Sequence, residues 1–311
     1  MMLWVSEENM GLIVKIRNRI IQIIAPMLTV VSPELNTRLL FWQKFGRKLN
    51  LEDPKTLNEK ILFLKLRSYE KDVLVRQCAD KYAVRDYVKD LGFEEILVPL
   101  LGTYDSPDEI EWDKLPPQFV IKWNFGCGFN IICRDKEEFD IESSKKMLKK
   151  WGNNKYYLSH SEMQYKNTPK KIIIEEYLTS DNGAPLPDDY KFYCFNGKVI
   201  YILVCANRRY KGTHAIADYV FFDRDWNVMP YSEYAIKNID NIHINKPRLL
   251  ENAIAIAEKL CAPFDFVRTD LYILDNKIYF GELTFTPAGG MDTDLFTGDV
   301  EMGKLLRITN R

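Results

Sequence analysis

The sequence predicts an α+β protein in which a helical N-terminal region precedes two mixed or antiparallel sheets. The first 95 residues have mostly helical patterns, whereas the chain beyond them is dominated by short runs of β-branched and aromatic residues such as QFVIKW, KVIYILVC and KIYFGELTF. Only the segments near 141–152 and 247–261 interrupt these strands with helical patterns. Helices followed by strands favour an α+β fold over a parallel, doubly wound one.

Composition places the chain among ordinary globular proteins. Its 311 residues are 46 % hydrophobic and 28 % charged, and 43 basic against 44 acidic side chains leave a net charge of −1. These values exclude a disordered chain, a collagen, a coiled-coil rod and a polytopic membrane protein. The length allows roughly two domains of 100–200 residues. Without a basic excess, we expect no nucleic-acid partner.

Residues 11–31 predict a basic amphipathic helix. Three basic residues between 15 and 19 interrupt the apolar run, so the remaining stretch is too short to span a bilayer. We expect the helix to end near Pro26 and again at Ser32-Pro33. Two interpretations stay open: a helix packed on the body of the protein, or a peripheral anchor on a membrane surface.

Two further helices are predicted before the first strand. Thr56 and Glu59 have the spacing of a capping box, which starts a helix over TLNEKILFLKL. A second helix is predicted over 72–91, through CADKYAVRDYVKD, and ends at the following glycine. On this helix we expect Lys81 and Arg85 to pair with surface neighbours, and contact with a substrate is the alternative.

A glycine-rich turn joins two predicted strands. Strand 119–123 carries Lys122 near its end, residues 124–128 form the turn, and strand 129–133 follows. Glycines let backbone N–H groups approach a phosphate, and a lysine adds a positive charge. Because no helix follows, the turn is neither a Walker A loop nor a dinucleotide fingerprint. It either cradles a phosphate or is an ordinary hairpin turn.

Two later segments bring acidic residues together. With a three-residue loop at 275–277, Asp270 would lie opposite Glu282 and Arg268 opposite Thr284, with Cβ atoms roughly 4.5–5.5 Å apart. Mg²⁺ would relieve the repulsion between the carboxylates, usually together with phosphate oxygens. The alternative is a surface hairpin with an Arg–Glu pair, and a one-residue shift in register would separate the acids.

Cysteine and histidine spacing indicates neither disulfides nor zinc. The six cysteines contain no C-x-x-C pair and most lie in apolar runs, so we expect free, buried thiols in a reducing compartment. The three histidines are far apart in the sequence, which argues against a zinc site.

Five motifs follow one another in a specific order between about Phe45 and Pro287: TLNEKI, ADKYAVRDYV, the Lys122 turn, DYKFYCFNGK and FGELTFTP. This order resembles the ATP-grasp superfamily, and most closely its teichuronopeptide-biosynthesis, or TupA-like, family. The resemblance implies an ATP-grasp fold in which two α+β subdomains clamp ATP, with ATP and Mg²⁺ as cofactors.

The resemblance also implies a role for each matching residue. Lys122 would contact the α- and β-phosphates below the closing turn, and the end of the KIIIEEYL strand would line the adenine and ribose pocket. Thr284 departs from the asparagine common at the third metal position, and a hydroxyl is a weaker ligand. The implied residues are Lys122, Asn124, Gly126, Gly128, Glu175, Glu176, Tyr177 and Leu178 for the nucleotide, Arg268 and Lys191 for catalysis, and Asp270, Glu282 and Thr284 for the metal.

These expectations divide the chain into four parts. They are an amphipathic helical region (1–50), a helical or α+β subdomain (51–117), an ATP-grasp subdomain with the glycine turn (118–178) and a C-terminal ATP-grasp subdomain with the metal site (179–311).

The implied activity is that of an ATP- and Mg²⁺-dependent carboxylate–amine ligase in surface-polysaccharide or capsule biosynthesis. ATP would convert a carboxylate into an acyl phosphate, which an amine attacks. The expected partners are a carboxylate-bearing sugar or glycan and an amine. Because no signal peptide is evident, we expect a cytoplasmic protein, with peripheral contact at the inner membrane face through residues 11–31 left open.

Other function classes stay open. An ATP-grasp kinase would stop at phosphorylation, and a glycosyltransferase acting on a polysaccharide precursor would use Asp223-Arg224-Asp225 as a D-x-D metal motif, although these residues also suit a turn. A non-catalytic nucleotide sensor would keep its biological activity after Glu282→Gln. The basic stretch 207–211 either grips an anionic substrate or is a solvated loop.

Overall fold

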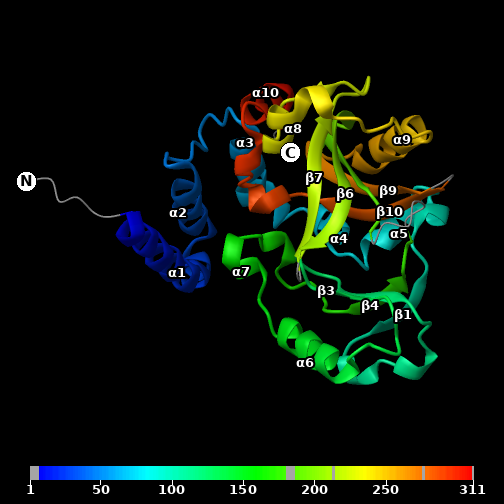
Figure 1. Cartoon of the computed structure of the whole chain (residues 1–311). Helices are drawn as coiled ribbons and strands as arrows, with labels where there is room; N and C mark the ends of the chain where they lie inside the picture. The colour runs from blue at the N-terminus through cyan, green and yellow to red at the C-terminus, as the bar shows by residue number, and fades with distance from the viewer. Residues whose placement is uncertain (1–6, 180–185, 212–213, 275–276, 310–311) are drawn as a thin grey trace, which may run out of the picture.

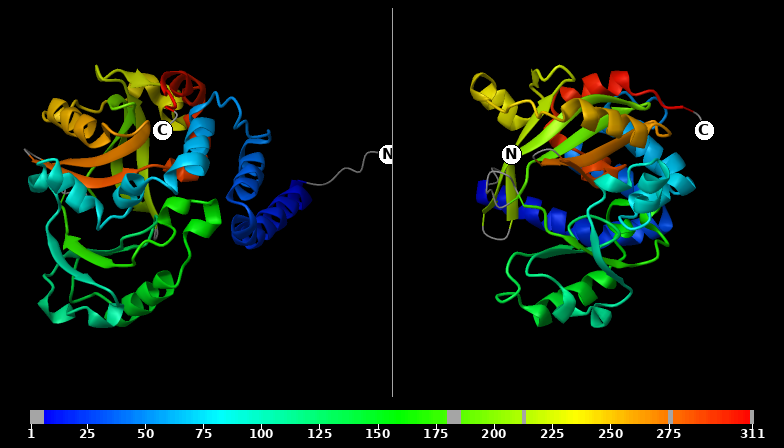
Figure 2. Two further views of the ribbon diagram at one scale, coloured as in Figure 1. Left: turned by 180° about the vertical axis from the view of Figure 1, so that it is seen from behind. Right: turned by 90° about the vertical axis from the view of Figure 1, so that its right-hand side faces the viewer.

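The computed structural model describes residues 7–179, 186–211, 214–274 and 277–309, and it confirms an α+β fold with two antiparallel sheets. Figure 1 shows a four-stranded sheet below a six-stranded sheet, with the N-terminal helices α1 and α2 to one side. The views in Figure 2 show the same two layers from behind and from the side.

The small sheet has the strand order β1-β4-β2-β3 and is antiparallel throughout. Phe119, Ile121 and Trp123 alternate along β2 and are buried in a core with α6, so Lys122 faces the other side, toward the large sheet. The four-part division of the chain remains a prediction. Strand β1 belongs to this sheet, although it precedes residue 118, where the predicted ATP-grasp subdomain begins. Its elements are β1 (Leu100–Tyr104), β2 (Phe119–Trp123), β3 (Asn130–Cys133), α6 (Ile141–Gly152), α7 (Tyr157–His160) and β4 (Ile172–Glu176).

The large sheet has the order β10-β9-β5-β6-β7-β8 and is also antiparallel. The buried alanines of α9 pack on β5, β6 and β9, while Lys191 and Asp270, paired across β5 and β9, line a cavity on the opposite face. Its elements are β5 (Asp189–Phe195), β6 (Lys198–Lys211), β7 (His214–Phe222), β8 (Val228–Met229), α8 (Glu233–Asn238), α9 (Leu250–Cys261), β9 (Phe266–Leu274), β10 (Lys277–Thr284) and α10 (Gly298–Leu305).

The N-terminal region is helical and contains the capping box predicted at Thr56 and Glu59. The single helix predicted over 72–91 is wrong, because the chain breaks at Asp80. The Asp80 carboxylate accepts the N–H groups two and three residues further on, which competes with the helical hydrogen bonds. The helices are α1 (Glu7–Val31), α2 (Pro33–Phe45), α3 (Leu57–Leu64), α4 (Val73–Ala79) and α5 (Val84–Asp90).

Helix α1 continues through Pro26, so the predicted end at this proline is wrong. A proline inside a helix costs about 3 kcal/mol, but buried Ile21, Ala25 and Thr29 hold α1 on both sides of it. The helix ends at Val31, directly before Ser32-Pro33, as predicted, and Ser32 caps α2. Among the described residues, no helix is long and apolar enough to cross a bilayer.

The cysteines are free, and five of the six are buried as predicted. Cys127 is exposed, so the prediction is wrong for this residue. It lies in the glycine turn, which borders an open cavity rather than a packed core.

Candidate functional site

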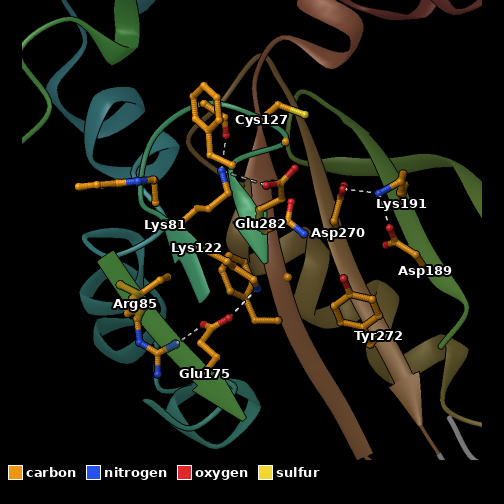
Figure 3. Close-up of a pocket in the computed structure, with 18 of the residues that line it drawn as sticks. Lys81, Arg85, Lys122, Cys127, Glu175, Asp189, Lys191, Asp270, Tyr272 and Glu282 are labelled. Atoms are coloured by element: carbon orange, nitrogen blue, oxygen red, sulfur yellow. Dashed lines mark hydrogen bonds and ion pairs between the residues drawn. The ribbon is translucent and has the colours of Figure 1, made fainter. Parts of the chain in front are cut away.

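A cavity of about 230 Å³ lies between the two sheets. Figure 3 shows Lys122 and Glu175 on the small-sheet side, and Asp270, Glu282 and Lys191 on the strands of the large sheet. The cavity is therefore built from strands β2 to β6, β9 and β10, with the glycine turn and the turn after α4 at its rim.

The glycine turn joins β2 to β3, as predicted, and its backbone is left-handed at Gly126 and Gly128 (φ +67° and +78°). A Cβ on Gly126 would lie 2.7 Å from the ring of Tyr156, so a larger residue does not fit there. Asn124 is fully buried and donates to Asp80 Oδ2 (2.8 Å). Its side chain therefore shapes the turn and does not line the cavity.

Lys122 and Glu175 form an ion pair on the small-sheet side, with Nζ and Oε2 2.6 Å apart. Arg85 Nη1 lies 3.2 Å from the other oxygen of Glu175. Burial opposes the charged form of Lys122, but Glu175 outweighs it and raises the lysine pKa. Lys122 thus presents a permanent positive charge, which suits a phosphate.

A second cavity, of about 120 Å³, adjoins the first and shares five lining residues with it: Lys122, Asn130, Glu175, Arg208 and Tyr272. The end of the KIIIEEYL strand lines it. Its apolar walls suit a flat ring system. The other lining residues include Glu176, Tyr177, Leu178, Val98, Val120, Ile132, Leu186 and Pro187.

Asp270 and Glu282 lie directly opposite each other on β9 and β10, as predicted, but the loop and the register of the hairpin differ from the predicted ones. Lys277 pairs with Leu274, so the three-residue loop at 275–277 is wrong, and an unbroken ladder would place Asp270 opposite Gly281. A bulge at Gly281 shifts the register by one residue and restores the pair. A Cβ on Gly281 would lie 2.9 Å from the Asp270 carbonyl oxygen, which explains the glycine.

Three cations, Lys81, Lys191 and Arg268, and the hydroxyl of Thr284 surround this pair. Arg268 donates to both Asp270 oxygens (Nε–Oδ1 2.7 Å, Nη2–Oδ2 2.6 Å), and Lys191 Nζ lies 2.6 Å from Oδ2. Thr284 donates to Glu282 Oε1 at 2.8 Å and accepts from Arg268 at 3.2 Å. The Thr284 hydroxyl therefore bridges Glu282 and Arg268.

The charges of these groups stabilise one another. Burial opposes ionisation of Glu282, but Lys81, Arg268 and Lys191 outweigh it and lower its pKa to about 2. Burial also opposes the charge on Lys191, but the carboxylates of Asp189 and Asp270 outweigh it and raise the pKa of the lysine. At neutral pH, Glu282 is an anion among cations, as a metal- and phosphate-binding site requires.

Lys81 and Arg85 are cavity residues, so the preferred expectation of surface pairing on one helix is wrong. Lys81 Nζ donates to the Gly126 carbonyl and lies 3.5 Å from Glu282 Oε2. The break between α4 and α5 turns both side chains toward the small sheet. The sequence signal for this placement is that both residues lie in the ADKYAVRDYV motif. Helical periodicity alone does not show that they face the cavity.

The basic stretch 207–211 and the D-x-D motif, the other candidates from the sequence, differ in whether their residues line a cavity. Arg208 lines both cavities, whereas Arg209 pairs with Asp218 on the surface (3.3 Å). Asp223 accepts the N–H of Asp225 (2.9 Å) in the turn between β7 and β8, and neither residue lines either of these two cavities. Asp223-Arg224-Asp225 therefore form a turn, as the alternative interpretation expected.

The described residues contain no cluster of three or more His, Cys, Asp or Glu side chains that could hold a metal ion. Asp270 and Glu282 fit another arrangement, in which Mg²⁺ is bound by one or two carboxylates and by phosphate oxygens. Lys122, Lys191 and Arg268 supply the positive charge for those phosphates. The donor set thus suits Mg²⁺ bound together with a nucleotide.

Comparison with known proteins gives one family and a set of distant structures. The model of the TupA-like ATPgrasp family matches residues 59–306, and a search of curated proteins found no match. The D-alanine–D-alanine ligase of Bacillus anthracis has a TM-score of 0.43 and 18 % identity, over 74 % of this chain and 63 % of that chain. The corresponding ligase of Helicobacter pylori has a TM-score of 0.40 and 13 % identity, over 83 % and 69 %. N5-carboxyaminoimidazole ribonucleotide synthetase of Thermus thermophilus has 0.38 and 12 %, over 68 % and 46 %. The chain thus spans less than two thirds of the length of the first structures it matches.

Proposed function

Because the chain belongs to the TupA-like ATP-grasp family, we propose that it is an ATP- and Mg²⁺-dependent ligase that joins a carboxylate to an amine. The observation that carries this proposal is the Asp270–Glu282 pair, placed among Lys122, Lys191 and Arg268 in the cavity between the sheets. A carboxylate is a poor acylating agent, so activation by a phosphoryl group from ATP explains why anions and cations are gathered here.

Each side chain has a task in this reaction. Lys122 would hold the α- and β-phosphates, and the apolar second cavity would take the adenine ring. Asp270 and Glu282 would hold Mg²⁺, which neutralises phosphate charge when bound. Arg268 and Lys191 would stabilise the γ-phosphoryl group as the substrate carboxylate oxygen attacks it and ADP leaves.

The second half of the reaction needs protection from water. The amine attacks the carbonyl carbon of the acyl phosphate, the new C–N bond forms, and inorganic phosphate leaves. The glycine turn borders the cavity and would cover the acyl phosphate, since water would otherwise hydrolyse it. No nucleophilic side chain takes part.

For the substrate, we propose a carboxylate-bearing sugar or glycan of a surface polysaccharide, together with an amine, in the cytoplasm. Arg208 supports an anionic substrate, because it lines both cavities near Lys191 and is not needed for the metal pair. The family membership supports the ligase chemistry of this proposal.

The test is ADP release from Mg-ATP in the presence of a panel of uronic acids and amines. We expect release to require both substrates and an amide product to accumulate. Glu282→Gln should lower kcat about 100-fold, the usual effect of removing one contact to the transition state. Glu233→Gln, which changes an exposed glutamate on α8, is the matched control and should leave kcat unchanged.

Thermal unfolding separates binding from turnover. Mg-ADP at about 100 times its Kd should stabilise the protein by roughly 2.7 kcal/mol, and Glu282→Gln should lose the magnesium dependence. Stabilisation by UDP-sugars alone would overturn the proposal in favour of a glycosyltransferase. A stable phosphorylated product without any amine requirement would instead identify a kinase.

A further inference from the structure

Helix α1 packs against the protein through one face and leaves an apolar face exposed. Ile21, Ala25 and Thr29 are buried against α2 and α7. Successive residues of an α-helix are rotated by about 100° around its axis. The exposed apolar residues of α1 therefore lie together on a different side of the helix from the buried ones. This α1 apolar face consists of Ile20, Ile23, Met27, Val30 and Val31, which are 52–77 % exposed.

A buried polar network fixes the rotation of α1. Thr29 Oγ1 donates to the carbonyl of Leu158 (2.7 Å), and Asn36 Nδ2 donates to Thr29 Oγ1 (2.8 Å) and to Ser161 Oγ (3.0 Å). Turning the α1 apolar face inward would break both bonds of Thr29 and would leave the buried Asn36 amide without one of its acceptors. The face therefore points away from the protein because of specific contacts.

The charge around this face is positive. Arg17 and Arg19 are exposed and, by helical angle, flank the α1 apolar face on its two sides. Residues 11–45 contain five basic residues and one acidic residue, although the whole chain carries −1. That acid, Glu34, is already paired with Arg38 (2.8 Å) and Arg67 (2.9 Å).

We propose that the α1 apolar face docks the protein on an anionic lipid bilayer, with the helix lying along the membrane surface. A bilayer offers both an apolar interior and negative headgroups, which match a helix with an apolar stripe between arginines. A second copy of this chain matches less well, because a symmetric contact would oppose the same basic residues. The inference does not depend on the proposed ligase activity.

Flotation with lipid vesicles tests the proposal. The full chain should bind vesicles of phosphatidylcholine with one third phosphatidylglycerol, and binding should weaken at high salt. Ile23→Glu combined with Met27→Glu should lower the partition coefficient at least tenfold, since it places two charges in the apolar face. Val73→Glu is the matched control: Val73 is 74 % exposed at the start of α4, outside this face.

Three outcomes would overturn the proposal. They are no binding of the wild-type chain, equal binding of the double variant, and a dimer in sedimentation velocity that the double variant dissociates. Equal binding to pure phosphatidylcholine would contradict the role of Arg17 and Arg19. Stabilisation by Mg-ADP, measured on every variant, reports the folded nucleotide site separately, so failure of docking and failure of the ligase proposal are distinguishable.

Discussion

Lys81 joins the two walls of the cavity through one side chain. Its Nζ donates to the Gly126 carbonyl of the glycine turn and lies 3.5 Å from Glu282 Oε2 on the large sheet. Its own N–H donates to the Asn124 carbonyl at 2.8 Å. A residue from the turn between α4 and α5 thus positions the glycine turn relative to the carboxylate pair.

Replacing this ammonium should loosen the glycine turn. A hydrogen bond to a charged group contributes about 1.5–3 kcal/mol, so we expect Lys81→Met to speed amide exchange in residues 124–130 at least about tenfold. Hydrogen–deuterium exchange on peptides from this segment measures the effect. Lys89→Met is the control, because Lys89 pairs with Glu94 outside the cavity (2.9 Å). Unchanged exchange in Lys81→Met would show that other contacts hold the turn.

At the scale of the element, the hairpin of β9 and β10 sets the geometry of the carboxylates. Its bulge at Gly281 brings Glu282 opposite Asp270, and Thr284 opposite Arg268. The Asp270 carbonyl oxygen leaves no room for a side chain at the bulge. A glycine at this one position therefore determines whether the two acids share a face.

Gly281→Ala should damage stability and the site together. A Cβ 2.9 Å from backbone forces the strands apart, at about 1–3 kcal/mol, and separates the carboxylates. We expect a lower urea midpoint and a smaller stabilisation by Mg-ADP. Gly92→Ala serves as comparison: Gly92 has φ +84° with free space around it, so alanine should cost about 1 kcal/mol and leave Mg-ADP binding intact. Equal nucleotide responses in the two variants would contradict this role of the bulge.

This hairpin also shows what the sequence could predict. Strands, the capping box at Thr56 and the glycine turn depend on neighbouring residues, so local patterns found them. The acid pair was predicted correctly although its loop was wrong, because a bulge compensates for the shorter loop. The contact of Lys81 with Glu282 joins residues far apart in the sequence and depends on a break at Asp80, which no periodicity reveals.

At the scale of the whole molecule, buried Lys65 ties together three parts of the chain. It begins the π-helical turn after α3, and its Nζ donates to the carbonyls of His160 (2.8 Å) and Gly289 (3.2 Å). Gly289 follows the strand that carries Glu282, and His160 ends α7, which packs against α1 and α2. Protonation of this one side chain should therefore change the free energy of unfolding of the entire protein.

Burial lowers the pKa of Lys65 to about 8, although nearby Glu162 opposes the shift, whereas an unfolded lysine titrates at about 10.4. Between these values the unfolded chain binds one proton more than the folded chain, so stability rises with pH across this window. From pH 7 to 9.5 we expect Lys65 to add about 2 kcal/mol to the free energy of unfolding, measured by urea titration. Lys65→Met should lack this increment, because methionine does not titrate. Lys166→Met, which changes an exposed lysine, should run parallel to the wild type. Parallel curves for wild type and Lys65→Met would mean that Lys65 is solvated in the folded protein.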